Sequence, residues 1–423
     1  MTRVLVRASW QTANIGDVAH APGCLQALRR ADPDAELVLW AVWLDDRELR
    51  LIRTLLPDVT IVEGNVDRHG RPGTAALRAE FEAADVLVHG SGPAPLREAE
   101  MQAWRRLTGK PYGFFGVTFD PFDPAQDATL DDLGTMIDAL PPDYLSPGLR
   151  DTLEHAAFVY CRDSHSVGYL RGQGIDATFV PDAVFTADVA DAAAAAATLA
   201  EFGLDDGRFA CVIPSLRWTP YYRLRGLPPD QRSWRRDAVN AAYVERDMKV
   251  LRDGIETWVR RTGTPVLLVP EMIQEVELAR QYLADGYPAD VQPYVHHLPR
   301  YWDLSEAAGV YARAAAVFGH ECHSPILAST FGVPSLYVRV PNDTVKGRMW
   351  ADVGLPDSCA EIGPDAAVTW IEELLADPSA ARERATTANR VARGLLDDAA
   401  RQILQLASAG RGPRPAAREP VAS

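Results

Sequence analysis

The segment AAAVFGHECHSPILASTFGVPSLYVRV, residues 314–340, contains the pattern that decides the fold. Its first residues, 314–318, form a short apolar run of the kind found in buried strands, and residues 335–340 form a second such run. Between the two runs, Ser324 is a favourable N-cap for a helix and Gly332 is a favourable stop. The segment therefore predicts a strand, a short helix and a second strand of a parallel α/β sheet.

The same alternation continues along both halves of the chain. Short apolar runs of the first half alternate with helical segments. These runs are residues 4–8, 36–40, 59–62, 86–89 and 112–117. An alanine-rich segment, residues 188–200, follows as a helix or a flexible spacer, and a strand at residues 210–214 restarts the pattern. We therefore predict an α/β protein with two Rossmann-like domains, residues 1–190 and 205–408, and a ligand-binding cleft between them.

Length and charge narrow the class of protein. At 423 residues, the chain is too long for one ordinary hydrophobic core, which agrees with two domains. It contains 58 acidic residues against 43 Lys and Arg residues, and its formal net charge is −15. Because nucleic acids and anionic membranes are bound by basic surfaces, we expect neither as a partner. No apolar run is long enough for a membrane span, and the sequence does not determine the oligomeric state.

The cysteines and the two ends of the chain bear on the cellular compartment. The first residues indicate a buried strand and not a signal peptide. The five cysteines are scattered without C-x-x-C spacing, so we expect neither a disulfide framework nor a zinc ribbon. A reducing cytoplasm is therefore the predicted location. Residues 409–423 are rich in Gly, Pro and Arg and are predicted to be disordered.

Polar residues that suit catalysis lie between the strand and the helix of the opening segment. His320, Glu321, Cys322 and His323 follow a strand, and in a parallel sheet such loops lie at the carboxyl edge, where ligands bind. The alternative is that these residues only cap the helix and pack the loop. The spacing H-x-C-H is not that of the usual zinc sites, and no fourth ligand is evident, so we predict no metal and no cofactor.

Two loops of the first half have the same position after a strand. Asn14 and Asp17 follow the first strand, and they either bind hydroxyl groups of an acceptor or cap the next helix. Gly90 and Gly92 follow the strand at residues 86–89, where glycine lets the backbone approach an oxygen-rich group. This second loop lacks the lysine of a P-loop and the G-x-G-x-x-G spacing, so it is weak support for a nucleotide site.

Charged side chains follow further strands. Arg162 and Asp182 each lie after a strand, and we predict a structural salt bridge between them in preference to ligand contact. Residues 217–236 contain six arginines, starting with Arg217, among prolines and a glycine that predict a loop or lid. Arginine suits carboxylate and phosphate groups, and the alternative is a solvated loop. Lys346 is expected either at the same edge as the histidine loop or as an ordinary surface lysine.

The ordered set of these motifs resembles the polysaccharide pyruvyl transferase family over residues 3–405. The matching positions are Asn14-Ile15-Gly16-Asp17, Gly90 to Gly92, Arg162-Asp163-Ser164, Pro181-Asp182, Arg217, His323-Ser324 and Lys346. The resemblance implies a GT-B-like fold and the transfer of the enolpyruvyl carbon skeleton of phosphoenolpyruvate onto two sugar hydroxyls, which gives a pyruvate ketal. It also implies a histidine as general acid or base and arginines that bind the donor.

These matches set the predicted site. The catalytic residues are His323 and Glu321, and the residues that bind donor or acceptor are Asn14, Asp17, Gly90, Gly92, Arg217, Ser324 and Lys346. The predicted partners are a small-molecule donor, phosphoenolpyruvate or a nucleotide sugar, and a sugar acceptor.

One position departs from the family pattern, which usually has Arg-x-His where this chain has Glu321-Cys322-His323. A glutamate beside a trianionic donor costs roughly 1–4 kcal/mol through repulsion, in addition to the lost attraction. Either the arginines of residues 217–236 replace the missing charge, or the donor or the reaction has changed. In the second case, Glu321 holds an acceptor group or is a second acid–base group.

The leading prediction is therefore a transferase of carbohydrate biosynthesis that uses phosphoenolpyruvate. The alternatives are a GT-B-like glycosyltransferase that uses a nucleotide sugar and a non-catalytic ligand-binding protein on the same fold.

Overall fold

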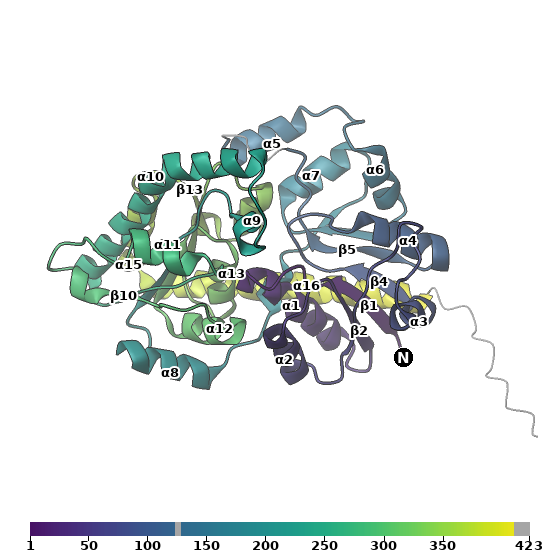
Figure 1. The fold of residues 1–423 in the computed structure, drawn as a ribbon, viewed down its shortest axis with the longest axis horizontal. Helices are drawn as coiled ribbons and strands as arrows, with labels where there is room; N and C mark the ends of the chain where they lie inside the picture. The colour runs from purple at the N-terminus through teal and green to yellow at the C-terminus, as the bar shows by residue number, and fades with distance from the viewer. Residues whose placement is uncertain (123–127, 410–423) are drawn as a thin grey trace, which may run out of the picture.

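The computed structural model describes residues 1–122 and 128–409. In these residues, two parallel β-sheets with helices packed on both faces lie side by side (Figure 1). The first sheet is built from residues before 180 and the second from residues after 209, so the described strands form no continuous sheet. The predicted α/β class with two Rossmann-like sheets is confirmed.

The first sheet has the strand order β3-β2-β1-β4-β5-β6-β7. Its strands are β1 (Arg3–Ala8), β2 (Glu36–Ala41), β3 (Thr60–Val62), β4 (Val86–His89), β5 (Tyr112–Val117), β6 (Phe158–Cys161) and β7 (Thr178–Phe179). The second sheet has the order β10-β9-β8-β11-β12-β13. Its strands are β8 (Ala210–Ile213), β9 (Val266–Leu268), β10 (Val295–His297), β11 (Ala316–Gly319), β12 (Ser335–Arg339) and β13 (Cys359–Glu361).

The helices follow the strands in both halves. Those of the first half are α1 (Ile15–Ala31), α2 (Asp46–Leu55), α3 (Ala75–Ala83), α4 (Glu98–Thr108), α5 (Leu130–Asp138), α6 (Pro147–Glu154) and α7 (Ser164–Gly172). The later helices are α8 (Ala192–Phe202), α9 (Tyr221–Leu224), α10 (Gln231–Thr262), α11 (Glu275–Tyr282), α12 (Leu304–Arg313), α13 (His323–Thr330), α14 (Met349–Asp352), α15 (Ala366–Ala376) and α16 (Pro378–Ala409).

Both strand orders reverse at one point. In the first sheet the reversal lies between β1 and β4, and in the second it lies between β8 and β11. In doubly wound folds, ligands bind outside the carboxyl ends of the strands at such a point, because neighbouring crossovers leave the sheet on opposite faces there. The loops after these four strands are therefore the natural place for a site.

Burial on both faces of the sheet explains why the apolar runs of the sequence form its central strands. Along β1, Val4 and Val6 pack into the core on one face of the first sheet, while Leu5 packs into the core on the opposite face. A strand covered on both faces is apolar along its length, which is the pattern that the sequence shows. Arg7 is fully buried in the same strand, and its guanidinium pairs with Glu100 at 2.5 Å.

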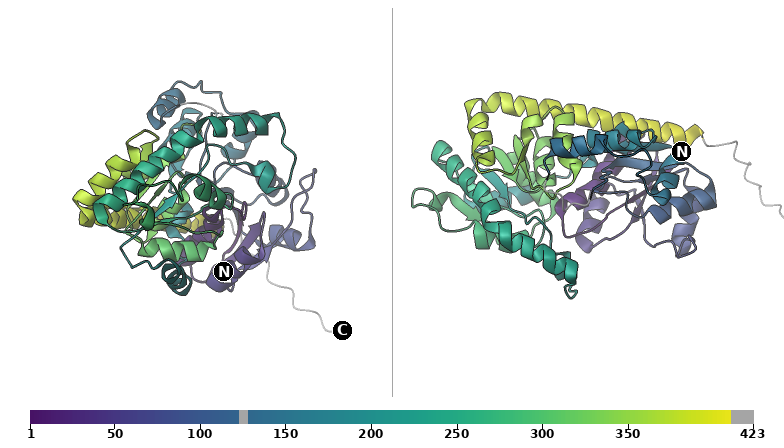
Figure 2. Two further views of the ribbon diagram at one scale, coloured as in Figure 1. Left: turned by 60° about the vertical axis from the view of Figure 1, so that its left-hand side comes forward. Right: turned by 90° about the horizontal axis from the view of Figure 1, so that it is seen from above.

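Backbone pairing and one long helix join the two halves. The backbone N–H of Ile15 donates to the carbonyl of Glu271 at 3.0 Å, and that of Ile273 donates to the carbonyl of Ala13 at 3.1 Å. Helix α16 runs along both halves (Figure 2) and packs against α1 and α13. The loop before α1 and the loop after β9 are therefore held face to face.

Two helix starts differ from the sequence prediction, and for a third segment the structure decides between the two predicted alternatives, a helix and a spacer. The sequence predicts α1 only from residue 23, but the helix begins at Ile15 and accommodates Pro22 in its interior. Residues 231–236, predicted as part of a loop, form the start of α10, because Asp230 caps this helix by accepting from the Ser233 backbone. The alanine-rich segment is helical as α8. The predicted disordered tail lies outside the described residues, apart from its first residue, which ends α16.

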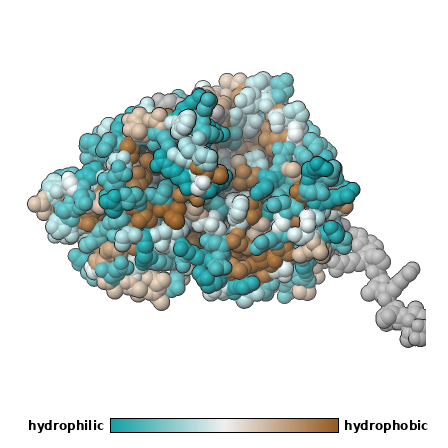
Figure 3. Space-filling view, viewed as in Figure 1, coloured by the Kyte–Doolittle hydropathy of each residue, from teal (hydrophilic) through white to brown (hydrophobic). Residues whose placement is uncertain are grey.

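Among the described residues, no helix is both long and apolar enough to cross a bilayer. On the face shown in Figure 3, hydrophilic residues prevail and apolar residues are confined to separate areas between them. This distribution agrees with a chain of formal net charge −15.

Candidate active site

His323 lies where the two halves meet. It is the first residue of α13, close after β11, and its side chain is only 8% exposed. On the opposite side, Gly16 of α1 approaches so closely that a Cβ atom on this glycine would lie 2.4 Å from the His323 ring. The structure thus brings the loop that contains Asn14 and Asp17 against the predicted catalytic histidine, and this close approach requires glycine at residue 16.

Two carboxylates hold the His323 ring. Its Nδ1 lies 3.1 Å from Oε1 of Glu271, and its Nε2 lies 3.8 Å from Oδ2 of Asp182. Burial lowers the pKa of His323, but the hydrogen bond and charge of Glu271 outweigh burial and raise this pKa above its ordinary value. The site therefore stabilises the imidazolium form, which can give up a proton.

Asp182 connects His323 to further polar side chains. Its Oδ2 accepts from Arg162 at 2.6 Å and lies 3.2 Å from Nε2 of His20, while the Ser91 hydroxyl donates to its Oδ1 at 3.1 Å. Burial alone would raise the pKa of Asp182, but His20, Arg162 and His323 hold it well below its usual range. The predicted salt bridge between Arg162 and Asp182 is confirmed.

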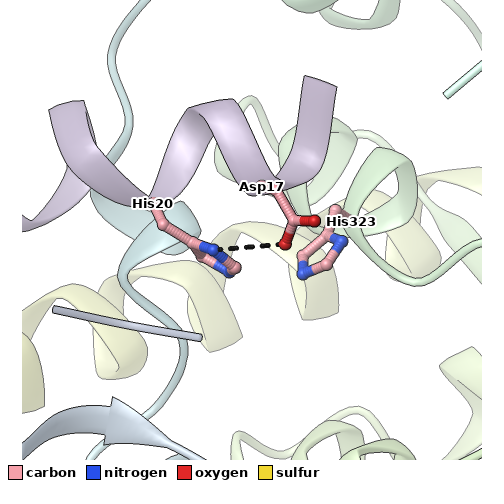
Figure 4. A group of neighbouring side chains, drawn as sticks. All are labelled: Asp17, His20 and His323. Atoms are coloured by element: carbon pink, nitrogen blue, oxygen red, sulfur yellow. Dashed lines mark ion pairs between the residues drawn. The ribbon is translucent and has the colours of Figure 1, made fainter. Parts of the chain in front are cut away.

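Asp17 lies between the two histidines. Figure 4 shows its carboxylate between the rings of His20, from the same helix, and His323, from the second half. The Asp17 Oδ1 atom is 3.6 Å from Nδ1 of His20. His20 was absent from the sequence prediction, although it follows Asp17 by three residues, the spacing that places side chains on one face of a helix.

Glu271 is the second site residue that the sequence does not predict. Its contacts also show that the role of Ser324 differs from the predicted one. The predicted N-cap role of Ser324 is wrong, because α13 begins at His323, two residues earlier than predicted, and its N-cap residue Cys322 makes no side-chain capping hydrogen bond. The Glu271 carboxylate instead accepts from the Ser324 backbone at 2.7 Å and from the Ser324 hydroxyl at 2.8 Å. A signal existed, since Glu271 follows β9 at a carboxyl edge, as the predicted residues follow their strands.

Glu321, two residues before His323, belongs to a pair of carboxyl groups. It is half-buried and accepts from the Ser215 hydroxyl at 2.6 Å. Burial and the charge of Glu271 raise the pKa of Glu321 to about 7. Beside it, burial and the charge of Glu321 raise the pKa of the fully buried Glu275 well above its ordinary value. The pair therefore keeps at least one proton at neutral pH.

Lys346 and Tyr221 lie near this carboxyl pair. Lys346 pairs with Asp343 at 3.0 Å; burial lowers its pKa, but the Asp343 charge raises it above the ordinary value. The lysine charge also acts on Glu321. Burial raises the pKa of Tyr221 to about 12, with smaller contributions from the charges of Asp17 and Glu321. The arginine-rich segment therefore places a tyrosine next to the site.

Arg217 points elsewhere. Its Nε donates to Asp247 at 2.6 Å, and its guanidinium lies 3.9 Å from the centre of the Tyr243 ring, both residues of α10. Within the described parts of the chain, none of its hydrogen bonds or ring contacts is with His323 or Glu321. It lines a separate cavity of about 450 Å³. Its position after β8 was read correctly, but the direction of its side chain depends on α10.

Three further predicted residues, Asn14, Gly90 and Gly92, make contacts that stabilise the loops around the site. The Asn14 side chain caps α1 by accepting from the backbone of Gly16 at 2.6 Å and of Asp17 at 3.2 Å. Gly90 packs against β1, and a Cβ atom on Gly92 would lie 2.8 Å from Nε1 of Trp10. The glycine-rich loop therefore packs against its own half of the protein. Ser91, between the two glycines, donates a hydrogen bond from its hydroxyl to Asp182.

Three residues could hold a metal ion. One ligand atom each of Asp17, His20 and His323 lies within 4.8 Å of the others. Among the described residues, Nδ1 of His20 and Nε2 of His323 are buried without a hydrogen-bond partner. Of the H-x-C-H stretch only His323 belongs to this group, and Cys322 is poorly suited as a ligand because burial raises the pKa of its thiol to about 12.

Two parallel α/β sheets that share a site between their carboxyl edges define the GT-B class. The structure is similar to that of MnaA from S. aureus in complex with UDP, with a TM-score of 0.57 at 9% identity over 94% of each chain. It is also similar to Alr3699/HepE from Anabaena in complex with UDP, with a TM-score of 0.53 at 11% identity over 97% of this chain and 99% of that chain. At such identities, the likeness shows a shared fold alone.

A third similar structure is UDP-GlcNAc 2-epimerase from Neisseria meningitidis bound to UDP-GlcNAc, with a TM-score of 0.52 at 10% identity over 91% of this chain and 94% of that chain. No curated protein is significantly similar to the chain in sequence. The model of the polysaccharide pyruvyl transferase family, however, matches residues 14–342, well over half of the chain. The chain therefore belongs to the polysaccharide pyruvyl transferase family and is a transferase with a GT-B fold.

Proposed function

We propose that this transferase moves the pyruvyl group of phosphoenolpyruvate onto two hydroxyls of a sugar acceptor. The methylene carbon of the donor gains a proton, and the neighbouring carbon forms two C–O bonds to the acceptor while its C–O bond to phosphate breaks. The two acceptor hydroxyls lose their protons. One proton ends on the new methyl group and one on the released phosphate, so atoms and charge balance.

The position of His323 carries this proposal. The reaction needs a group that gives a proton to the donor carbon and takes one from a hydroxyl. His323 lies at the seam of the two halves, with Glu271 at 3.1 Å and Asp182 at 3.8 Å. These carboxylates stabilise its protonated form, and Asp17 and His20 provide a path along which a proton can leave.

The carboxyl pair lowers the electrostatic cost of an anionic donor. With a pKa of about 7, Glu321 is partly protonated at neutral pH, so its repulsion of phosphoenolpyruvate is weaker than that of a fixed charge. Lys346 is the lysine whose charge acts on Glu321, and it supplies attraction on the same side. Arg217 pairs with Asp247 and Lys346 pairs with Asp343, so both cations are partly neutralised in this conformation, and Lys346 is the one whose charge acts at Glu321.

A glycosyltransferase that uses a nucleotide sugar is the second candidate, and the UDP complexes of structurally similar proteins favour it. One contact opposes it. The N-terminus of a helix is where a diphosphate binds in such folds, and at α13 the Glu271 carboxylate already accepts from the Ser324 backbone. A ligand-binding protein without activity is the third candidate, which the glutamate at residue 321 favours.

Calorimetry separates these functions without knowledge of the acceptor. Phosphoenolpyruvate and UDP-N-acetylglucosamine are titrated in turn into the wild-type protein. Binding of phosphoenolpyruvate alone supports the proposal, and phosphate release in the presence of sugars then distinguishes turnover from mere binding. Binding of the nucleotide sugar alone would falsify it.

Two further proposals concern the domain boundaries and the cellular location. We propose residues 1–190 and 205–408 as the two domains, each with its own sheet. We also propose a cytoplasmic location, which is supported by five cysteines that are all free in the structure.

A further inference from the structure

A second cavity lies between the two halves, next to the His323 cluster. Its volume is about 520 Å³, within the usual range for small-molecule sites. Its walls come from the start of α1, from α2, from residues 189–193, which lead into α8, and from residues 301–305, which lead into α12. These segments include the loops after β1, β2 and β10, so this cavity also opens at the carboxyl edges of both sheets.

The cavity is one residue layer away from the candidate acid–base group. Ile15 lines it, and the Ile15 backbone donates to the carbonyl of Glu271, the residue that holds His323. Trp302 also lines it, and its indole N–H donates to the carbonyl of Pro270 at 2.8 Å. A ligand in the cavity would therefore contact Ile15 and Trp302, which donate hydrogen bonds to the backbone of the loop that contains Glu271.

The polar groups at the cavity are unusual. Glu48 is 2% exposed, and neither of its carboxyl oxygens has a partner at hydrogen-bond distance within the described residues. Burial raises its pKa to about 8, although the nearby Ser9 side chain lowers it. The Tyr301 hydroxyl is also buried there without a partner in that part of the chain. Next to Glu48, Ser9 is buried in the left-handed region at φ 61°. Unpaired buried polar groups and strained backbone cost stability, and they gather at binding sites.

The charge around the cavity selects among ligands. Three carboxylates, Asp45, Asp191 and Asp303, line it together with the carboxyl group of Glu48, which keeps its proton near neutral pH, against the two arginines Arg47 and Arg50. This balance disfavours a trianion such as phosphoenolpyruvate. The rest of the wall is largely aliphatic, including Leu51 and Leu55 of α2. Apolar walls with a few hydrogen-bonding groups suit a neutral molecule that presents both hydroxyls and C–H faces.

We infer that this cavity binds the sugar acceptor, as a neutral, hydroxyl-rich ring with Glu48 and Tyr301 as hydrogen-bonding partners. This inference rests on the proposed function, because it assigns the acceptor to the cavity and the donor to the side of Glu321 and Lys346. Glu48 can donate as well as accept while it keeps its proton, and sugar hydroxyls need both. His323 is not among the residues that line this cavity, so the ring held there is a part of the acceptor remote from the two reacting hydroxyls.

The test uses the full chain and three probes, the methyl glycosides of glucose, mannose and galactose. Saturation-transfer difference spectra are recorded at millimolar glycoside for wild type, for Leu51→Trp, which fills the cavity, and for Leu107→Trp, a matched change at an exposed leucine of α4. We expect signals from at least one glycoside with wild type and Leu107→Trp, and a loss of at least about tenfold in affinity with Leu51→Trp.

Phosphoenolpyruvate calorimetry on the same proteins separates the two proposals. If Leu51→Trp keeps donor binding and loses glycoside binding, the assignment of the cavity stands. If no glycoside gives a signal with wild type, or if Leu51→Trp binds glycosides as wild type does, the assignment is overturned. Glycoside binding at the cavity without phosphoenolpyruvate binding to wild type would overturn the proposed donor and leave the sugar site in place.

Discussion

The two helices that meet at the candidate active site, α1 and α13, begin in different ways. At α1, the side chain of Asn14, the residue just before the helix, accepts from two N–H groups of the first turn. At α13, the accepting side chain is Glu271, which comes from the loop after β9 and is 53 residues away from Ser324. Both helix starts satisfy their free N–H groups with oxygen, but only the first does so with a neighbour in sequence.

This difference has a consequence for function. The cap of α1 is a neutral amide whose recorded hydrogen bonds are within its own turn. The cap of α13 is a charged carboxylate that also holds His323, so the start of this helix is coupled to the protonation of the acid–base group. Removal of the first cap should therefore cost mainly stability, whereas removal of the second should change both stability and chemistry.

The largest effect is expected for His323→Ala. If His323 is the acid–base group at the start of α13, turnover should fall by about 10²–10⁴-fold while donor binding changes much less. Phosphate release with the true acceptor measures turnover, and calorimetry with phosphoenolpyruvate measures binding. His155→Ala, at an exposed histidine of the first half, is the control. Equal turnover in both variants would remove His323 from the mechanism.

Glu271→Gln should separate the capping role of Glu271 from its charge. The amide oxygen can still accept from Ser324, but the charge that raises the pKa of His323 is lost. The imidazolium then persists only to lower pH, so the loss of activity with rising pH should start at lower pH, with activity reduced roughly 10–100-fold near neutrality. A pH–rate profile is the measurement, and Glu277→Gln on the exposed face of α11 is the control.

Glu271→Ala tests the capping role of Glu271 through the stability of the protein. It leaves the Ser324 N–H and hydroxyl buried without their acceptor, so the free energy of unfolding should fall by about 2–4 kcal/mol, measured in urea. The glutamine variant should lose much less. A pH profile of Glu271→Gln identical to that of wild type would mean that α13 and His323 are not coupled through this carboxylate.

Glu321, just before α13, should control donor affinity through its charge. Its pKa of about 7 lies above the ordinary value, so the group is ionised above neutrality and protonated below it. Glu321→Gln should therefore bind phosphoenolpyruvate about tenfold more tightly than wild type near pH 8 and almost equally near pH 6. Calorimetry at both values tests this, and comparison at the same pH cancels the titration of the donor itself. Glu245→Gln on the exposed face of α10 is the control.

Glu321→Arg restores the residue that the family usually has at this position. Donor binding should be kept or improved if phosphoenolpyruvate is still the donor. If Glu321 holds an acceptor group or shares the proton transfer, activity should be abolished in spite of that binding. A wild-type protein that does not bind phosphoenolpyruvate, together with an arginine variant that does, would reject the pyruvyl reaction for this chain.

The smallest effect is expected at α1. Asn14→Ala removes the local cap, so the free energy of unfolding should fall by about 1 kcal/mol, with phosphoenolpyruvate binding unchanged. Asn14→Asp should retain most of the stability. Thr129→Ala, which removes the cap of α5, is the matched control. A loss of donor binding in Asn14→Ala would show that this residue contacts the donor and is more than a cap.

Much of the fold was predictable because its signals are local. Apolar runs at residues 4–8 and 86–89 predicted β1 and β4 to within one residue at each end, since a strand covered on both faces is apolar along its length. The start of α10 and the interior Pro22 of α1 were missed. Pro22 lies inside α1, although a proline usually ends a helix, whereas α10 begins directly after Pro228 and Pro229 with Asp230 as its cap.

The candidate site was predictable in position but not in its contacts. Placing each polar residue after a strand correctly brought Asp17 and His323 to one edge. It could not show that Arg217 turns toward Asp247, because the direction of a side chain depends on what packs beside it. It also missed His20 and Glu271, whose roles arise only when α1 and the loop after β9 face α13.

The sequence by itself thus determined the two parallel sheets, the edge at which their loops gather and the family to which the chain is similar. These features depend on hydrophobic periodicity and on short motifs, which act over a few residues. Tertiary packing fixes which carboxylates hold His323, why the pKa values of Glu321 and Glu275 are both raised, and where a second cavity lies. Those properties depend on distances between groups that are far apart in the chain, and on the burial that makes their charges interact strongly.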